Sequence, residues 1–159
     1  MRITFIGQAP SRETDGKPPF TGKCGRFLAE LLGTTQEQML LDHDFINVLD
    51  YWPGKGIGGD KFPLPAAKIS ARKKLMSLKG KLCILLGNNV ARAFDCKQFR
   101  YLEWYEIRNP DNFADVVIPL MTIVPHPSGV NRYYNDPDKR LIVAKFLRII
   151  AARKDPEKP

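Results

Sequence analysis

The sequence predicts an α/β fold, a three-layer α/β/α sandwich with a central, largely parallel sheet. Short apolar runs alternate along the chain with stretches whose apolar residues recur at helical spacing. Glycines end two of the apolar runs, at Gly7 and Gly87. The length of 159 residues is that of one domain. We therefore expect a single domain over residues 1–152, followed by a flexible tail over residues 153–159.

Four short strands are expected. Residues 1–7 form an apolar run that ends at a glycine, and residues 45–49 form a second buried run. Residues 81–86, KLCILL, are the clearest strand of the chain. Residues 116–124 hold the last strand, which Pro119 breaks or bends.

Helices are expected between and after these strands, at residues 26–32, 65–78, 88–94 and 137–152. The third begins with an asparagine in the capping position, and the fourth has one apolar and one basic face. In a parallel sheet joined by helices, the loops beyond the carboxyl ends of the strands build the functional site. Here these loops are residues 8–22, 50–65, 87–89 and 125–136.

The charge balance indicates a polyanionic partner. Lysine and arginine number 25 and aspartate and glutamate 17, which gives a formal net charge of +8. Nucleic acid ranks ahead of an anionic membrane as that partner, and a basic surface that only faces solvent is the alternative. No apolar run approaches the ~18 residues of a membrane-spanning helix, and the N-terminal run is too short for a signal peptide.

The cysteines give no sign of a metal centre. Cys24, Cys83 and Cys96 are scattered along the chain and never follow a C-x-x-C spacing. This pattern fits neither a disulfide framework nor a zinc or iron–sulfur site. We expect a reduced, cytoplasmic and monomeric protein that holds no metal, no iron–sulfur cluster and no other cofactor.

Two of the loops carry most of the unusual residues. The first reads GQAPS and then PFTGKCG, which places Phe20 where it is either a stacking platform for a base or a core residue. The last reads PHPSGVNRYYND. His126 offers a hydrogen bond or a charge there, and Ser128 and nearby backbone N–H groups can grip a phosphate. Arg132, with the two tyrosines that follow it, adds charge and stacking surface.

These motifs resemble, in order, those of the uracil-DNA glycosylase superfamily. The resemblance rests on IGQAPS, PPFTGKCG, FINVLDYWP, LLGNNVARAF and VPHPSGVNR, and it runs from about residue 3 to residue 147. It implies an α/β/α sandwich that flips a base out of double-stranded DNA. It also implies hydrolysis of the N-glycosidic bond of that base, which leaves an abasic site.

The resemblance implies a role for several side chains. Phe20 would stack on the flipped base, and Asn47 would read its Watson–Crick edge. His126 would stabilise the charge of the departing base, and Ser128 would clamp a DNA phosphate. Val130 stands where members insert a wedge residue into the vacated stack. Further DNA contacts are expected from Gly129, Asn131, Arg132, Tyr133 and Lys55.

The first loop departs from the family in its carboxylates. Ala9 stands where uracil-excising members have an aspartate, and Gln8 where the iron–sulfur class has a glutamate. A further class has its aspartate at the position of Lys23. Glu13 and Asp15 lie in the same loop and are candidate replacements, although loop acids of this kind often only face solvent.

The resemblance implies a pocket that is more open on the side of Ser11. This serine replaces a tyrosine that, in uracil-excising members, blocks substituents at carbon 5 of the pyrimidine. A bulky 5-substituted base, such as the glucosylated hydroxymethylcytosine of phage DNA, fits these departures, and some relatives remove that base in antiviral defence. One alternative is a repair glycosylase for uracil or deaminated bases, with Asn47, Gln8 or Glu13 placing the water. Others are a catalytically inactive DNA-binding module and, on the weak signal at 87–89, a nucleotide-binding enzyme.

Overall fold

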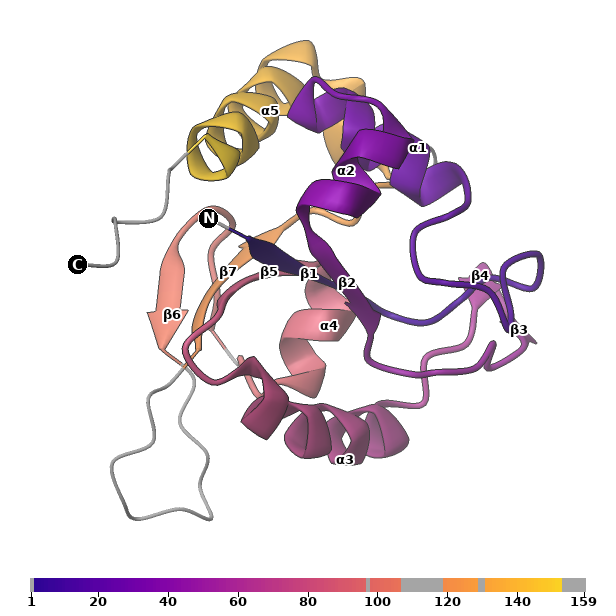
Figure 1. Cartoon of the computed structure of the whole chain (residues 1–159). Helices are drawn as coiled ribbons and strands as arrows, with labels where there is room; N and C mark the ends of the chain where they lie inside the picture. The colour runs from indigo at the N-terminus through magenta and orange to yellow at the C-terminus, as the bar shows by residue number, and fades with distance from the viewer. Residues whose placement is uncertain (1, 97, 107–118, 129–130, 153–159) are drawn as a thin grey trace.

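The computed structural model describes residues 2–96, 98–106, 119–128 and 131–152. Its main sheet has the strand order β2-β1-β5-β7-β6 (Figure 1). The first four of these strands run parallel, and β6 pairs antiparallel with β7 at one edge. The expected largely parallel sheet is therefore confirmed. The strands span β1 Ile3–Gly7, β2 Asp44–Asn47, β5 Leu82–Leu86, β6 Trp104–Glu106 and β7 Leu120–Val124.

Helices cover both faces of the sheet, which confirms the three-layer arrangement. One group lies above the sheet in the view of Figure 1, and the other lies below it. The upper group consists of α1 Lys23–Leu32, α2 Gln36–Asp42 and α5 Pro137–Ala151. The lower group consists of α3 Leu64–Leu75, the short 3₁₀ turn Met76–Leu78 and α4 Asn88–Ala93.

Two hydrophobic cores hold these layers together. Phe5 and Ile84 face the core beneath α1 and α5, whereas Ile6 and Leu85 face the core above α3 and α4. All four side chains are completely buried. Successive residues of a strand point to opposite faces, so a strand covered on both sides reads as one continuous apolar run. This burial explains why β1 and β5 are clear in the sequence.

The prediction of an asparagine cap on α4 is wrong. Gly87 occupies the cap position, and Asn88 is already the first residue of the helix. The Asn88 carboxamide oxygen accepts a hydrogen bond from the Tyr101 hydroxyl instead. Gly87 has a φ of +98°, and a Cβ there would lie 2.9 Å from the His126 Cβ. Both the backbone conformation and this close approach to His126 favour glycine at the position.

Some elements were not expected. Helix α2 begins after Thr35, whose hydroxyl accepts a 3.1 Å hydrogen bond from the Gln38 N–H. The segment expected as an open loop contains a small antiparallel hairpin, β3 Lys55–Gly56 with β4 Gly59–Asp60. Strand β6 was also missed. The start of the expected strand at residues 116–118 and the tail at 153–159 lie outside the described residues.

Candidate active site

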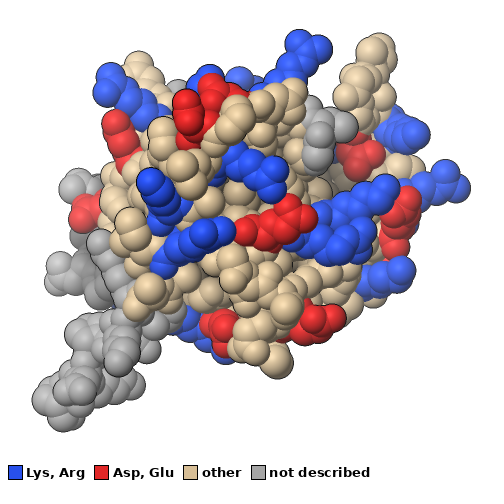
Figure 2. Space-filling view, turned by 90° about the horizontal axis from the view of Figure 1, so that it is seen from above, with Lys and Arg blue, Asp and Glu red and all other residues tan. Residues whose placement is uncertain are grey.

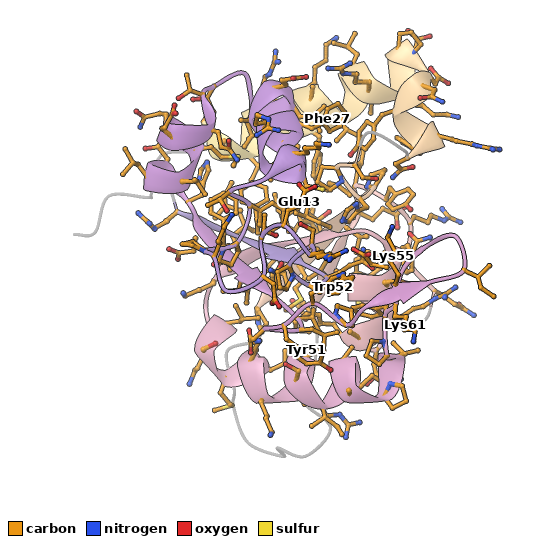
Figure 3. The ribbon with its side chains drawn as sticks, turned by 90° about the vertical axis from the view of Figure 1, so that its right-hand side faces the viewer. Glu13, Phe27, Tyr51, Trp52, Lys55 and Lys61 are labelled. Carbon is orange, nitrogen blue, oxygen red and sulfur yellow. The ribbon has the colours of Figure 1, made fainter. Side chains whose placement is uncertain are left out.

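The loops that follow β1, β2 and β7 surround a cavity of about 420 Å³. Figure 3 looks toward the end of the molecule that holds these loops, with Glu13, Trp52 and Lys55 toward the viewer. The cavity therefore lies beyond the carboxyl ends of parallel strands, as the topology leads one to expect. Its lining includes these side chains expected from the sequence: Gln8, Ser11, Glu13, Phe20, Asn47, His126 and Ser128.

Gly7 brings two of these side chains together. It ends β1 and pairs with Asn47, the last residue of β2. A Cβ at Gly7 would lie 2.5 Å from the Asn47 Oδ1 and 2.7 Å from the Phe20 Cζ. Only glycine leaves room for both groups at this close approach. The carboxamide of Asn47, which is only 8% exposed, and the ring of Phe20 thus lie next to each other on the cavity wall.

Phe20 is held in an uncommon backbone conformation. Its φ is +62°, in the left-handed region that bulky residues rarely adopt. The Gln36 side chain on α2 donates a 2.6 Å hydrogen bond to the Phe20 carbonyl. The ring packs against Phe45 with 5.4 Å between ring centroids, while it also lines the cavity. Strain of this kind persists only where surrounding contacts fix it, and it concentrates at functional sites.

Gln8 is fixed by a residue that the prediction did not include. Its Oε1 accepts a 2.6 Å hydrogen bond from the side-chain N–H of Asn89, on α4. With the oxygen engaged, the Gln8 amide N–H groups are the part left for the cavity. The signal for Asn89 was present in the motif LLGNNVARAF, but its contact with Gln8 joins residues 81 positions apart.

The loop after β7 holds His126 in a braced turn. The His126 carbonyl accepts hydrogen bonds from the Asn131 side chain at 2.9 Å and from the Ser128 N–H at 2.8 Å. The buried Tyr134 hydroxyl donates to the carbonyl of Pro125 at 2.7 Å. Asn131, expected to contact DNA, therefore shapes the turn from within, and Ser128 lies on the cavity wall.

Burial sets the protonation state of His126. It lowers the pKa of the imidazole, because desolvation disfavours the charged form. At neutral pH the ring is neutral, with one N–H donor and one acceptor nitrogen. Burial also raises the pKa of the Cys24 thiol, which lines the same cavity. That thiol stays protonated at neutral pH and is a poor nucleophile.

The acidic residues near the cavity differ in their placement. Glu13 lines the cavity and is exposed. The Asp15 carboxylate instead accepts a 3.0 Å hydrogen bond from the Trp52 N–H, and Asp15 does not line the cavity. Asp60, on β4, lines the cavity and was not expected. The glycine-rich sequence around Asp60 indicates only a loop. It carries no signal that Asp60 lines the same cavity as the first loop.

The other residues expected to contact DNA differ in their exposure. Arg132 and Lys55 are exposed. Tyr133 is half-buried and packs edge-on against Tyr101 with 5.5 Å between ring centroids. Gly129 and Val130 lie outside the described residues.

Among the described residues, the cations near the cavity form no ion pairs, unlike several cations elsewhere. Helix α3 pairs Lys68 with Asp95 and Lys74 with Asp50. The face of α1, α2 and α5, seen in Figure 2, intersperses basic and acidic side chains. No ion pair within the described ranges involves the cations on or next to the cavity wall: Arg12, Lys23, Lys55 and Lys61.

The described residues form neither a metal-binding cluster nor a membrane-spanning helix. Within the described ranges, no three side chains of His, Cys, Asp or Glu are grouped so that they can hold a metal ion. The helices in the same part of the chain are all too short or too polar to span a membrane.

Comparison with known proteins identifies a family relationship. The family model described as "Uracil DNA glycosylase superfamily" matches residues 1–148. A comparison with curated proteins found no match. The matched region contains every element of the main sheet and every described residue of the cavity wall.

Proposed function

The chain belongs to the uracil DNA glycosylase superfamily, and from this membership we propose that it excises a modified pyrimidine from DNA. Membership implies a DNA glycosylase type of activity, with DNA as the substrate. The finer proposal is that the base carries a bulky substituent at carbon 5, as in the glucosylated hydroxymethylcytosine of phage DNA. Removal of such a base serves antiviral defence.

Phe20 and Asn47 together bind the flipped base, Phe20 through its face and Asn47 through its edge. Enzymes that act on a base in a duplex must first flip it out of the stack and then hold it by stacking and by hydrogen bonds. Phe20 supplies an aromatic face on the cavity wall, and the adjacent Asn47 carboxamide supplies one donor and one acceptor group. A carboxamide matches the mixed donor and acceptor pattern of a pyrimidine edge.

The bond to the sugar breaks by dissociation. The electron pair of the N-glycosidic bond leaves with the base, and the sugar becomes an oxocarbenium-like cation. Neutral His126 donates a hydrogen bond to the anionic base, while the DNA phosphates and Glu13 or Asp60 stabilise the cation. Water then adds to the sugar carbon and passes its proton to one of these carboxylates or to solvent. Gln8, held by Asn89, orients that water through its amide N–H groups.

The observation that carries the substrate proposal is the size of the cavity that Ser11 helps to line. A cavity of about 420 Å³ falls within the ~300–1,000 Å³ range of pockets that enclose drug-sized ligands, so it has room for more than a pyrimidine ring. Arg12, Thr14 and Lys23 line the same cavity as Ser11. Their polar groups suit the hydroxyls of a sugar substituent.

A paired substitution tests whether the protein is an enzyme or only a DNA-binding module. Asn47→Ala should lower the single-turnover rate of base excision at least tenfold and leave duplex affinity within about threefold. Asn135→Ala, at an exposed position of the turn before α5, is the matched control and should retain both. A wild-type protein that binds duplex DNA but yields no alkali-labile site in any modified substrate would contradict the proposal.

A further inference from the structure

The β3–β4 hairpin exposes an apolar side chain beside the cavity. Ile57 stands at the hairpin tip and is 111% exposed, more than any other large apolar side chain among the described residues. Isolated exposed apolar residues are common on protein surfaces and need no explanation by themselves. Ile57 differs from such isolated residues because it lies next to the cavity and, in sequence, between Lys55 and Lys61.

The hairpin is fixed to the rest of the fold. The Lys61 N–H donates a 2.8 Å hydrogen bond to the Gly54 carbonyl and so extends the two-stranded pairing. At the base of the hairpin, Asp15 in the first loop accepts the 3.0 Å hydrogen bond from the Trp52 N–H. The turn is completed by Gly58, whose φ of +85° favours glycine. Ile57 therefore lies at the tip of a two-stranded ribbon whose base is hydrogen-bonded to the first loop.

The hairpin brings Ile57 within reach of a DNA strand entering the cavity. Asp60 lines the cavity and pairs with Lys55 across the hairpin. Ile57 lies two residues beyond Lys55, which is about 7 Å along a strand. Consecutive nucleotides of a strand are spaced about 3.4 Å along the duplex axis, so this distance equals about two base pairs. Lys55 and Lys61 lie on the same end of the molecule (Figure 3).

From this arrangement we infer that the hairpin is a second DNA wedge, in addition to the one expected at Val130. Ile57 inserts into the duplex about two base pairs from the phosphate that Lys55 contacts. Lys55 and Lys61 neutralise the phosphates on either side. This inference rests on the proposed function. A two-stranded ribbon fits a DNA groove, and apolar side chains between base steps keep a duplex unstacked. A second copy of this chain is a poorer occupant, because its formal charge of +8 would repel these lysines.

The test uses a short duplex with one tetrahydrofuran abasic-site analogue and 2-aminopurine at the neighbouring position. This probe requires no knowledge of the excised base. Wild-type protein should raise the 2-aminopurine fluorescence as the neighbouring stack opens. Ile57→Ser should reduce that rise by at least half and weaken binding about tenfold, since it removes the hairpin wedge. Ile149→Ser, at a position on α5 that is 63% exposed, is the matched control and should behave as wild type.

The possible results separate this inference from the proposed function. If Ile57→Ser keeps the affinity and the fluorescence rise, the wedge is overturned, while excision by the wild-type protein continues to report the proposed function. If Ile57→Ser instead dissociates a dimer in sedimentation and leaves DNA binding intact, the tip contacts a second copy, which also overturns the wedge. A wild-type protein that does not bind the duplex overturns both proposals.

Discussion

Asn89 holds Gln8 in place across the cavity wall, with 2.6 Å between the Asn89 Nδ2 and the Gln8 Oε1. The donor lies on α4, after β5, and the acceptor follows β1, so the two neighbouring strands of the sheet position one side chain of the site. The resemblance described above suggests that one class of the superfamily has a glutamate at the position of Gln8. The contact shows that this side chain is oriented even though it carries no charge.

The Asn89–Gln8 contact leads to the first prediction. Asn89→Ala should release the Gln8 side chain and lower the single-turnover excision rate about tenfold, the size expected for the loss of one positioning hydrogen bond. Gln8→Glu should retain the contact, because a carboxylate accepts the same N–H group, and it should excise at least as fast as wild type. Circular dichroism melts serve as the control for folding. Equal rates in wild type and Asn89→Ala would show that the contact has no catalytic role.

The acidic residues give a second prediction, because their contacts differ. Glu13→Gln and Asp60→Asn remove carboxylates that line the cavity, and at least one of them should lower the excision rate tenfold or more. Asp15→Asn weakens the hydrogen bond to the Trp52 N–H and should reduce thermal stability with little effect on the rate. Single-turnover kinetics at saturating enzyme separate these effects. Wild-type rates in both Glu13→Gln and Asp60→Asn would show that neither carboxylate stabilises the sugar cation.

The histidines give a third prediction, on the pH dependence of stability. Burial lowers the pKa of both His126 and His43 in the folded protein. Above pH ~6.5 both states of the chain hold these rings neutral, and the full stability is present. As the pH falls below ~6.5, the unfolded chain takes up protons first, so the free energy of unfolding decreases until the lowered pKa values are reached. Urea titrations between pH 8 and pH 5 measure this decrease.

Substitution of His126 checks both the pH effect and the mechanism. His126→Asn should reduce the decrease in stability at low pH, and a His126→Asn chain that shows the wild-type slope would contradict the assignment. At neutral pH, His126→Ala should raise the excision barrier by about 2–4 kcal/mol through loss of the donor to the departing base. A rate loss of less than threefold would remove His126 from the chemistry.

Ser11 gives a fourth prediction, on substrate choice. Its hydroxyl lies 3.0 Å from the Thr14 hydroxyl, and the turn is also held by the hydrogen bond from the Thr14 N–H to the Ser11 carbonyl. Ser11→Tyr should therefore keep the turn and fill the cavity. Excision of a glucosylated base should fall at least tenfold, whereas excision of any unsubstituted pyrimidine that the wild type accepts should change little. Ser77→Tyr, at an exposed site after α3, is the control.

The parts of the fold that the sequence could predict are those with the strongest burial. Strands β1 and β5 are covered on both faces, so their apolar runs are unmistakable. The site residues after those strands follow from the topology, since parallel strands direct their carboxyl ends to one edge. Helix α2 was missed although Thr35 and Gln38 have the spacing of a capping box.

Other features depend on contacts that local sequence does not encode. The glycines around Ile57 indicate a loop but do not show whether it closes into a hairpin. The antiparallel pairing of β3 with β4 in the structure closes it. Asn131 is expected from the sequence only as a DNA contact, because its hydrogen bond to the His126 carbonyl forms only in the folded turn. The hydrogen bond between Asp15 and the Trp52 N–H likewise joins two loops that only the sheet brings together.

The most direct test is a glycosylase assay on two DNAs side by side, with abasic sites revealed by alkali. One is phage DNA that carries glucosylated hydroxymethylcytosine, and the other is a duplex that contains uracil. We expect alkali-labile sites in the phage DNA and few or none in the uracil duplex. Cleavage of the uracil duplex alone would contradict the substrate proposal and indicate a repair enzyme. An absence of alkali-labile sites in both DNAs would contradict the proposed excision of a bulky 5-substituted pyrimidine.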